Sequence, residues 1–256
     1  MTSSMTPGLD YYTGVFWGPC QETPEELAAR WLKLIARLQQ IDPIFTHWYI
    51  WVDVDRAVPF DTNGAPLAEK IAAKVSRSDS GKPTPQLGYQ LFAHNTATQK
   101  RGQRNFEIHM FAGKFTTRSH NWVAIRTDYG VVPDPNVVTF KIIRGALLAL
   151  AETFEATIGS AYPASLIDLW PKGGQGRGQL TLKLAWITYV APLFAHLITP
   201  PVSALVERRP DGGLLMAATD ETFVTTNPAH LAVARKIEAA AAPFNALPYP
   251  WETAIR

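Results

Sequence analysis

Glu107 and His109 are the residues whose types and spacing come closest to a catalytic pair in this chain. They stand two positions apart in a segment predicted to be a strand, so both side chains point to the same face. A carboxylate and an imidazole placed in this way can share a proton or bind a metal ion. His94 and His120 lie on other segments and would complete a zinc site only if the fold gathered them, because such sites need three or four converging ligands. A metal-dependent hydrolase or a small-molecule-binding protein that uses these residues is the alternative function. The simpler interpretation is that the histidines are hydrogen-bonded or lie on the surface.

The stretch FWGPC at residues 16–20 is similar to part of a thiol-disulfide active site. Such a site needs a cysteine on each side of Gly-Pro, because one thiolate attacks and the second thiol resolves the mixed disulfide. Trp17 occupies the position of the attacking cysteine, and Cys20 is the single cysteine of the chain. The stretch therefore indicates a tight turn between a strand and a helix, in which Cys20 is expected to be dispensable.

Other signatures of catalysis or phosphate binding are incomplete or missing. The glycine-rich run KGGQGRGQ at residues 172–179 lacks the phosphate-loop spacing and precedes a predicted strand, whereas a phosphate loop precedes a helix. Lys100, Arg101 and Arg104 form a short basic cluster that has the charge to contact phosphates but is typical of a solvated loop. The sequence contains neither a G-x-S-x-G elbow nor an H-E-x-x-H motif. These segments therefore build no catalytic constellation, and we expect no catalytic residue, no metal and no cofactor.

Residues 47–55, HWYIWVDVD, alternate with the period of a strand and carry an unusual second face. Tyr49, Trp51, Asp53 and Asp55 project together from that face. Aromatic side chains are enriched at interface hot spots, and the two carboxylates would meet a basic partner surface. We predict that this face contacts a partner protein. The alternative is that a helix covers the two aromatic residues and only the aspartates reach water.

The composition is that of an ordinary globular protein. The chain has 256 residues, of which 46% are hydrophobic and 18% charged, and its net charge is only +2. This balance argues against nucleic acid or a membrane surface as a direct partner. One cysteine excludes an internal disulfide, and the first residues have neither the basic nor the apolar region of an export signal. We expect a cytoplasmic protein whose oligomeric state is left open, a homo-oligomer included.

Hydrophobic periodicity predicts which elements position these residues. A helix over residues 24–40 begins with a capping box, in which Thr23 caps the helix and Glu26 lies three residues later. Apolar residues with helical spacing also predict helices over 136–156, with Asn136 as cap, over 66–75, and from 228 to 242. Alternation predicts strands over 11–17, 86–94, 105–115, 122–127 and 182–190, and a hairpin over 205–217. These elements predict a single α+β domain over residues 1–256, with a largely antiparallel sheet packed against several helices.

Several blocks of the sequence together resemble the immunity protein 52 family of bacterial polymorphic toxin systems. The most specific are Trp-Gly-Pro at residues 17–19 with the helix start that follows, Ile-Asp-Pro at 41–43, Asp-Gly-Gly at 211–213 and Asn-Pro at 227–228. The resemblance spans nearly the whole chain and is weakest over residues 57–103. None of these blocks is a catalytic motif.

The resemblance implies a non-enzymatic inhibitor. Members of the family are encoded beside toxins with a restriction-endonuclease-like domain, often delivered by type VI secretion, and they bind the toxin to protect the producing cell. The partner implied here is a cognate nuclease toxin, and Tyr49, Trp51, Asp53 and Asp55 are the predicted contact residues. Because the chain is nearly neutral, it is not expected to mimic DNA over its whole surface. Local acidic contacts, or a site that blocks toxin assembly, both stay open.

Overall fold

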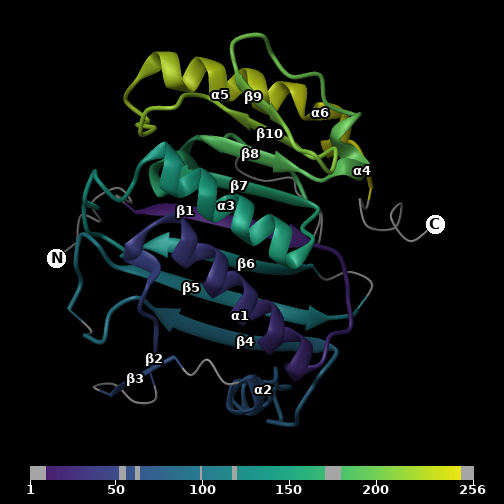
Figure 1. Cartoon of the computed structure of the whole chain (residues 1–256). Helices are drawn as coiled ribbons and strands as arrows, with labels where there is room; N and C mark the ends of the chain where they lie inside the picture. Colours follow the sequence, from purple (N-terminus) through teal and green to yellow (C-terminus); the bar gives the residue numbers. More distant parts are fainter. Residues whose placement is uncertain are drawn as a thin grey trace, which may run out of the picture.

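The computed structural model describes residues 10–51, 56–60, 64–98, 100–116, 120–170 and 180–248. Its centre is a 10-stranded sheet in which the strands follow the order β3-β2-β4-β5-β6-β1-β7-β8-β10-β9 and every neighbouring pair is antiparallel (Figure 1). The predicted α+β class with an antiparallel sheet is confirmed. The strands are β1 (Tyr11–Trp17), β2 (Tyr49–Trp51), β3 (Ala57–Pro59), β4 (Leu87–His94), β5 (Phe106–Lys114), β6 (Asn121–Thr127), β7 (Ile158–Pro163), β8 (Ile187–Val190), β9 (Leu205–Arg208) and β10 (Leu214–Ala217).

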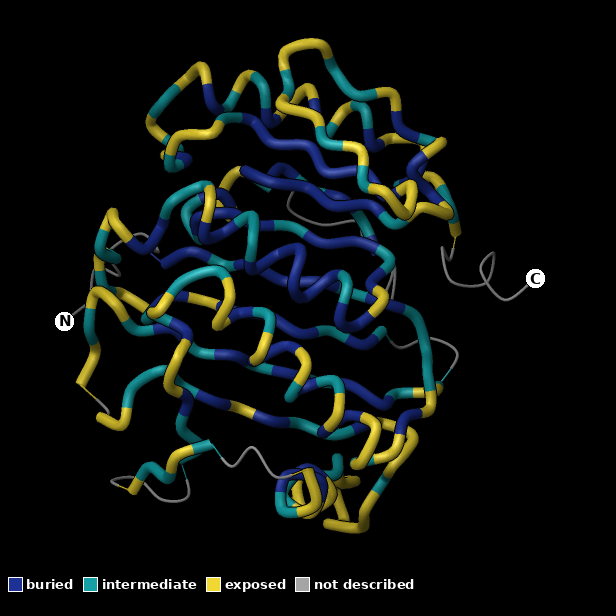
Figure 2. The backbone as a smooth tube through the Cα atoms, viewed as in Figure 1, coloured by how far each residue is buried: buried dark blue, intermediate teal, exposed yellow. Residues whose placement is uncertain are grey.

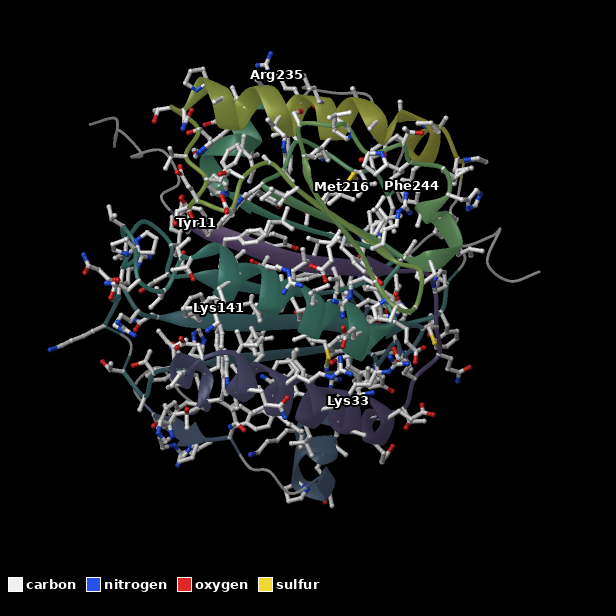
Figure 3. The ribbon with its side chains drawn as sticks, turned by 45° about the horizontal axis from the view of Figure 1, so that its top comes forward. Tyr11, Lys33, Lys141, Met216, Arg235 and Phe244 are labelled. Carbon is white, nitrogen blue, oxygen red and sulfur yellow. The ribbon has the colours of Figure 1, made fainter. Side chains whose placement is uncertain are left out.

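The helices are divided unequally between the two faces of the sheet. Helices α1, α2 and α3 pack together on one face, where α3 contacts β1, β6, β7 and β8 (Figure 1). Helix α5 packs against β10 and covers the other face at that end of the sheet, above Met216 (Figure 3). The helices are α1 (Pro24–Ile41), α2 (Gly64–Ala73), α3 (Phe140–Phe154), α4 (Pro192–Ala195), α5 (Pro228–Ala240) and α6 (Ala242–Asn245), with 3-10 turns at Pro43–Phe45 and Ala164–Leu169.

Helix α1 forms for the reasons that its sequence predicts. The Oγ1 of Thr23 accepts a hydrogen bond from the backbone N–H of Glu26, and the Glu26 carboxylate accepts one from the backbone N–H of Thr23. This capping box satisfies amides that the first turn would otherwise leave unpaired. The apolar stripe of the helix, which includes Trp31 and Leu34, is buried against the sheet. Asp42 ends the helix, since its side chain bonds the amide of Ile44 in the following turn.

Helix α3 begins later than its sequence pattern predicts, because Asn136 does not cap it. Asp134 accepts hydrogen bonds from both the backbone and the side-chain nitrogen of Asn136, which fixes a turn before the helix. The cap is Thr139, whose Oγ1 accepts from the amide of Ile142. The helix ends at Glu155, which adopts the left-handed conformation with φ of 51°, so the predicted extension to residue 156 is wrong.

Strand β7 has no counterpart in the sequence prediction, although it lies in the middle of the sheet beside β1. Its sequence IGSAYP follows α3 almost directly and contains small residues that carry little strand signal. A side chain at Gly159 would clash with Val15 and Leu147, so a close approach of α3 requires the glycine. The predicted strand over 182–190 is also shorter in the structure, where β8 begins only at Ile187.

Ionic side chains in β9 and directly after it pair with helix side chains and connect this edge of the sheet to the helices. Arg209 bonds Glu207 and lies 2.8 Å from Glu152 of α3, which lies 2.6 Å from Arg37 of α1. Glu207 also pairs with Arg144 of α3. The interior between these helices and the central strands is buried throughout, as the dark segments of Figure 2 show. The polar groups of this edge therefore serve the fold, and candidate sites have to be sought on the other face.

Candidate functional site

One face of the sheet carries partly exposed aromatic side chains, and none of the described helices packs on it over β4, β5 and β6. We call it the open face. Strand alternation separates it from the helix-covered face. In β5, Ile108 and Met110 are buried beneath the helices, while His109, which lies between them, points the other way. The open face is formed by Tyr12, Phe16, Tyr49, Trp51, Phe92, His94, Glu107, His109, Phe111, Trp122 and Arg126.

A row of polar residues crosses one end of the open face. The register places His94, Glu107, Arg126 and Tyr12 side by side on four neighbouring strands. Glu107 forms an ion pair with Arg126, and its second oxygen lies 3.9 Å from Nδ1 of His94. Burial lowers the pKa of His94, while the charge of Glu107 opposes that change. This row is a structural charge pair with a neutral histidine beside it.

Aromatic packing occupies the centre of the open face. The ring of His109 stacks on Phe92 with centroids 3.6 Å apart and meets the edge of Trp122 at 4.4 Å. Phe111 packs against the same tryptophan. Phe92 remains 43% exposed, which is unusual for a large aromatic residue in a sheet. Neighbouring apolar rings that water still reaches form the kind of patch that marks interaction sites.

Burial changes the chemistry of His109. It lowers the pKa of the imidazole to about 4, and the positive charge of Arg126 acts in the same direction. The Nε2 atom is buried and has no hydrogen-bond partner among the described residues. At neutral pH the ring is therefore uncharged and behaves as part of the aromatic cluster.

The predicted pair of Glu107 and His109 does lie on one face, but the structure does not bring the two side chains into a shared cavity. A hollow of about 360 Å³ is lined by Glu107, His94 and Asp128, among others, without His109. His120 lies further along the sheet, with its ring 5.4 Å from that of Phe16. Among the residues that the structure describes, no three His, Cys, Asp or Glu side chains are grouped so that they could hold a metal ion. Among the described residues, this face therefore presents packed aromatic rings and an ion pair.

The predicted contact residues of β2 are placed only in part. Tyr49 pairs with His94 across the strands, and the ring of Trp51 lies 6.2 Å from the ring of the same histidine. Both aromatic residues are half-buried and extend the open face beyond β4. Asp53 and Asp55 lie outside the described residues, so the structure says nothing of their carboxylates. Sequence reasoning missed the larger part of the open face, because Phe92, Phe111 and Trp122 come from three strands that only the folded sheet aligns.

Cys20 lies in the turn between β1 and α1, where its backbone N–H donates to the carbonyl of Lys114. Burial and the negative charge of Glu22 raise the pKa of its thiol. A raised pKa disfavours the thiolate that disulfide exchange requires. The environment of Cys20 thus agrees with a structural turn.

Comparison with known proteins decides the family. The family model described as Immunity protein 52 matches residues 10–243, which is most of the chain. The chain belongs to the immunity protein 52 family. No curated protein matches this family member. Among solved structures it is similar to the Pseudomonas aeruginosa T6SS protein PA0821, with 12% identity and a TM-score of 0.51 over 90% of this chain and 72% of that one. At this identity the likeness shows a shared fold.

Membership of the family makes the chain an immunity protein, a class whose members bind a cognate toxin. A protein of this class needs an exposed surface that recognises another protein. The open face presents aromatic side chains from five neighbouring strands. As a separate finding, none of the described helices is both long and apolar enough to cross a membrane.

Proposed function

We propose that this immunity protein neutralises a cognate secreted nuclease toxin with a restriction-endonuclease-like domain by binding it through the open face. The observation that carries the proposal is the partly exposed aromatic cluster of Phe92, His109, Phe111 and Trp122 on strands whose other face is covered by helices. Aromatic residues supply most of the binding energy in many protein interfaces, because they bury a large area with few rotatable bonds. Delivery of the toxin by type VI secretion is part of the proposal, and it is supported by the family resemblance and by the name of the similar Pseudomonas aeruginosa T6SS protein.

Inhibition by binding alone fits the chemistry of the face. The one carboxylate among its described residues, Glu107, is paired with Arg126, and its central histidine is neutral and packed between rings. Neither group is free to act as an acid or base on a substrate. The mixed charges of Glu107 and Arg126 also differ from the continuous negative surface that a DNA mimic would show. We therefore propose a non-enzymatic inhibitor that recognises the toxin protein itself.

The proposal is tested by producing a candidate toxin, encoded beside the gene for this chain, together with this chain. We expect the two proteins to co-purify, and the toxin's cleavage of DNA to stop at about one inhibitor per toxin. Cys20→Ser is the matched control, because a thiol without thiolate character should not matter, and its inhibition should equal that of the wild type. A toxin that cleaves DNA at the same rate with an excess of folded inhibitor would contradict the proposal.

A further inference from the structure

Two adjoining hollows lie beside the aromatic cluster, where the segment after α2 runs along β4. The first has a volume of about 500 Å³, and Trp51 and Phe92 form part of its wall. The second has a volume of about 410 Å³, and its apolar wall includes Phe111. Arg77 and Gln90 line both hollows. Together they form a groove that continues the open face toward α2.

The charged residues of this groove all have the same sign. Lys74 and Arg77 line the first hollow, and Arg77 and Lys114 line the second. No Asp or Glu of the described chain lines either hollow, and none of the three cations forms an ion pair with a described residue. We call this the basic groove. It is unlike the rest of the open face, where Glu107 balances Arg126.

Local backbone geometry places Lys114 in the basic groove. Gly113 has φ of +80°, a conformation that other residues rarely adopt, and a side chain there would press on the ring of Tyr89. This glycine interrupts the alternation of β5, and the Nζ of Lys114 comes to lie 3.4 Å from the centre of the Phe111 ring. The ring face attracts the ammonium group, but it does not replace an anion.

Lys114 is therefore a cation that has lost part of its water and gained no counter-charge from the described residues. Burial lowers the pKa of its ammonium group to about 8, and no carboxylate of the described residues offsets this change. A carboxylate brought by a partner would restore the missing interaction in a partly desolvated place, where a charged hydrogen bond is strong. The apolar side chains beside the cations would pack against the methylene groups of the partner residue that carries this carboxylate.

We propose that the toxin inserts Asp or Glu side chains into the basic groove, where Lys74, Arg77 and Lys114 receive them while apolar toxin residues cover Phe92 and Phe111. This inference rests on the proposed function, since it assigns a charge to the toxin surface that meets the open face. The toxin surface that meets the basic groove would then be acidic. The prediction that Asp53 and Asp55 contact the toxin requires a second, basic region on its surface. Two regions of opposite charge on one partner would also fix its orientation.

The test measures the association rate and Kd of purified toxin for Lys114→Glu at several salt concentrations. We expect Kd to rise at least about tenfold, mostly through slower association, and the salt dependence to become weaker. Lys33→Glu is the matched control, because Lys33 is an exposed lysine on α1, on the covered side of the sheet (Figure 3). It changes the net charge by the same amount and should leave Kd within about twofold of wild type. Lys74→Glu, at an exposed position after α2, should act like Lys114→Glu and serves as the readout if the latter does not fold.

The outcomes separate this inference from the proposed function. If the wild type fails to bind the toxin, the proposed function fails. If the wild type binds while Lys74→Glu, Arg77→Glu and Lys114→Glu all bind as tightly as Lys33→Glu, the basic groove is overturned and the proposed function stands. A second measurement uses a fluorescent DNA duplex as the probe. If the free wild type binds DNA and these variants do not, while their toxin binding is unchanged, the groove binds phosphates and the inference is overturned.

Discussion

At the scale of single residues, environment rather than identity decides what His109 does. Its type and spacing predict a metal ligand or a proton carrier, and the strand does place it on the same face as Glu107. The ring of Phe92 on the neighbouring strand removes it from water. No sequence pattern announces that contact, because the two residues are 17 positions apart and their pairing depends on the register of β4 and β5.

The low pKa of His109 predicts how stability depends on pH. The folded protein keeps the imidazole neutral down to about pH 4, whereas the unfolded chain takes up a proton near the ordinary value of 6.5. As pH falls between these values, the unfolded state binds more protons, so the free energy of unfolding decreases. The lowered pKa values of His94 and His120 act in the same direction.

Denaturant unfolding between pH 7 and pH 4 measures this effect. We expect His109→Gln to lose less stability over this interval than the wild type, because one of the three contributing groups is gone. His196→Gln replaces an exposed histidine and should follow the wild-type curve. A His109→Gln curve parallel to that of the wild type would show that burial does not shift this group.

At the scale of elements, the sequence predicted the helix starts and the hairpin that depend on interactions between residues close together in the chain. The capping box of α1, the hairpin of β9 and β10 and the start of α5 at Pro228 all appear as predicted. The predicted cap of α3, Asn136, was wrong because Asp134 binds the side chain of Asn136 and holds it in a turn before the helix. The central strand β7 escaped prediction because its stability comes from pairing on both edges with β1 and β8, which its own small residues do not reveal.

The capping box of α1 provides a test at this scale. Thr23→Ala removes the hydroxyl that accepts from the amide of Glu26, and we expect it to lower the free energy of unfolding by about 1 kcal/mol. Thr46→Ala is the control, because it truncates an exposed threonine after α1 and should change stability much less. Equal losses for the two variants in urea titrations would mean that the cap is not formed.

At the scale of the whole molecule, the sequence predicted the class of fold and the family but only part of the open face, through which we propose that the toxin binds. The predicted contact strand contributes Tyr49 and Trp51 to the open face, yet most of that face comes from β4, β5, β6 and β1. The open face exists because none of the described helices packs on that side of β4, β5 and β6. Which side the helices cover is a property of the assembled sheet. That residues 1–256 form a single domain remains a prediction.

The affinity of the toxin for Phe92→Ala tests the central claim most directly. Phe92 is 43% exposed, so its truncation should spare the fold while removing the most accessible ring of the open face. The account predicts that Kd rises about 30-fold, the loss of a typical hot-spot residue. The matched control is Leu193→Ala on α4, a residue 50% exposed, and it should bind as the wild type does. Equal affinity of both folded variants for the toxin would contradict the account.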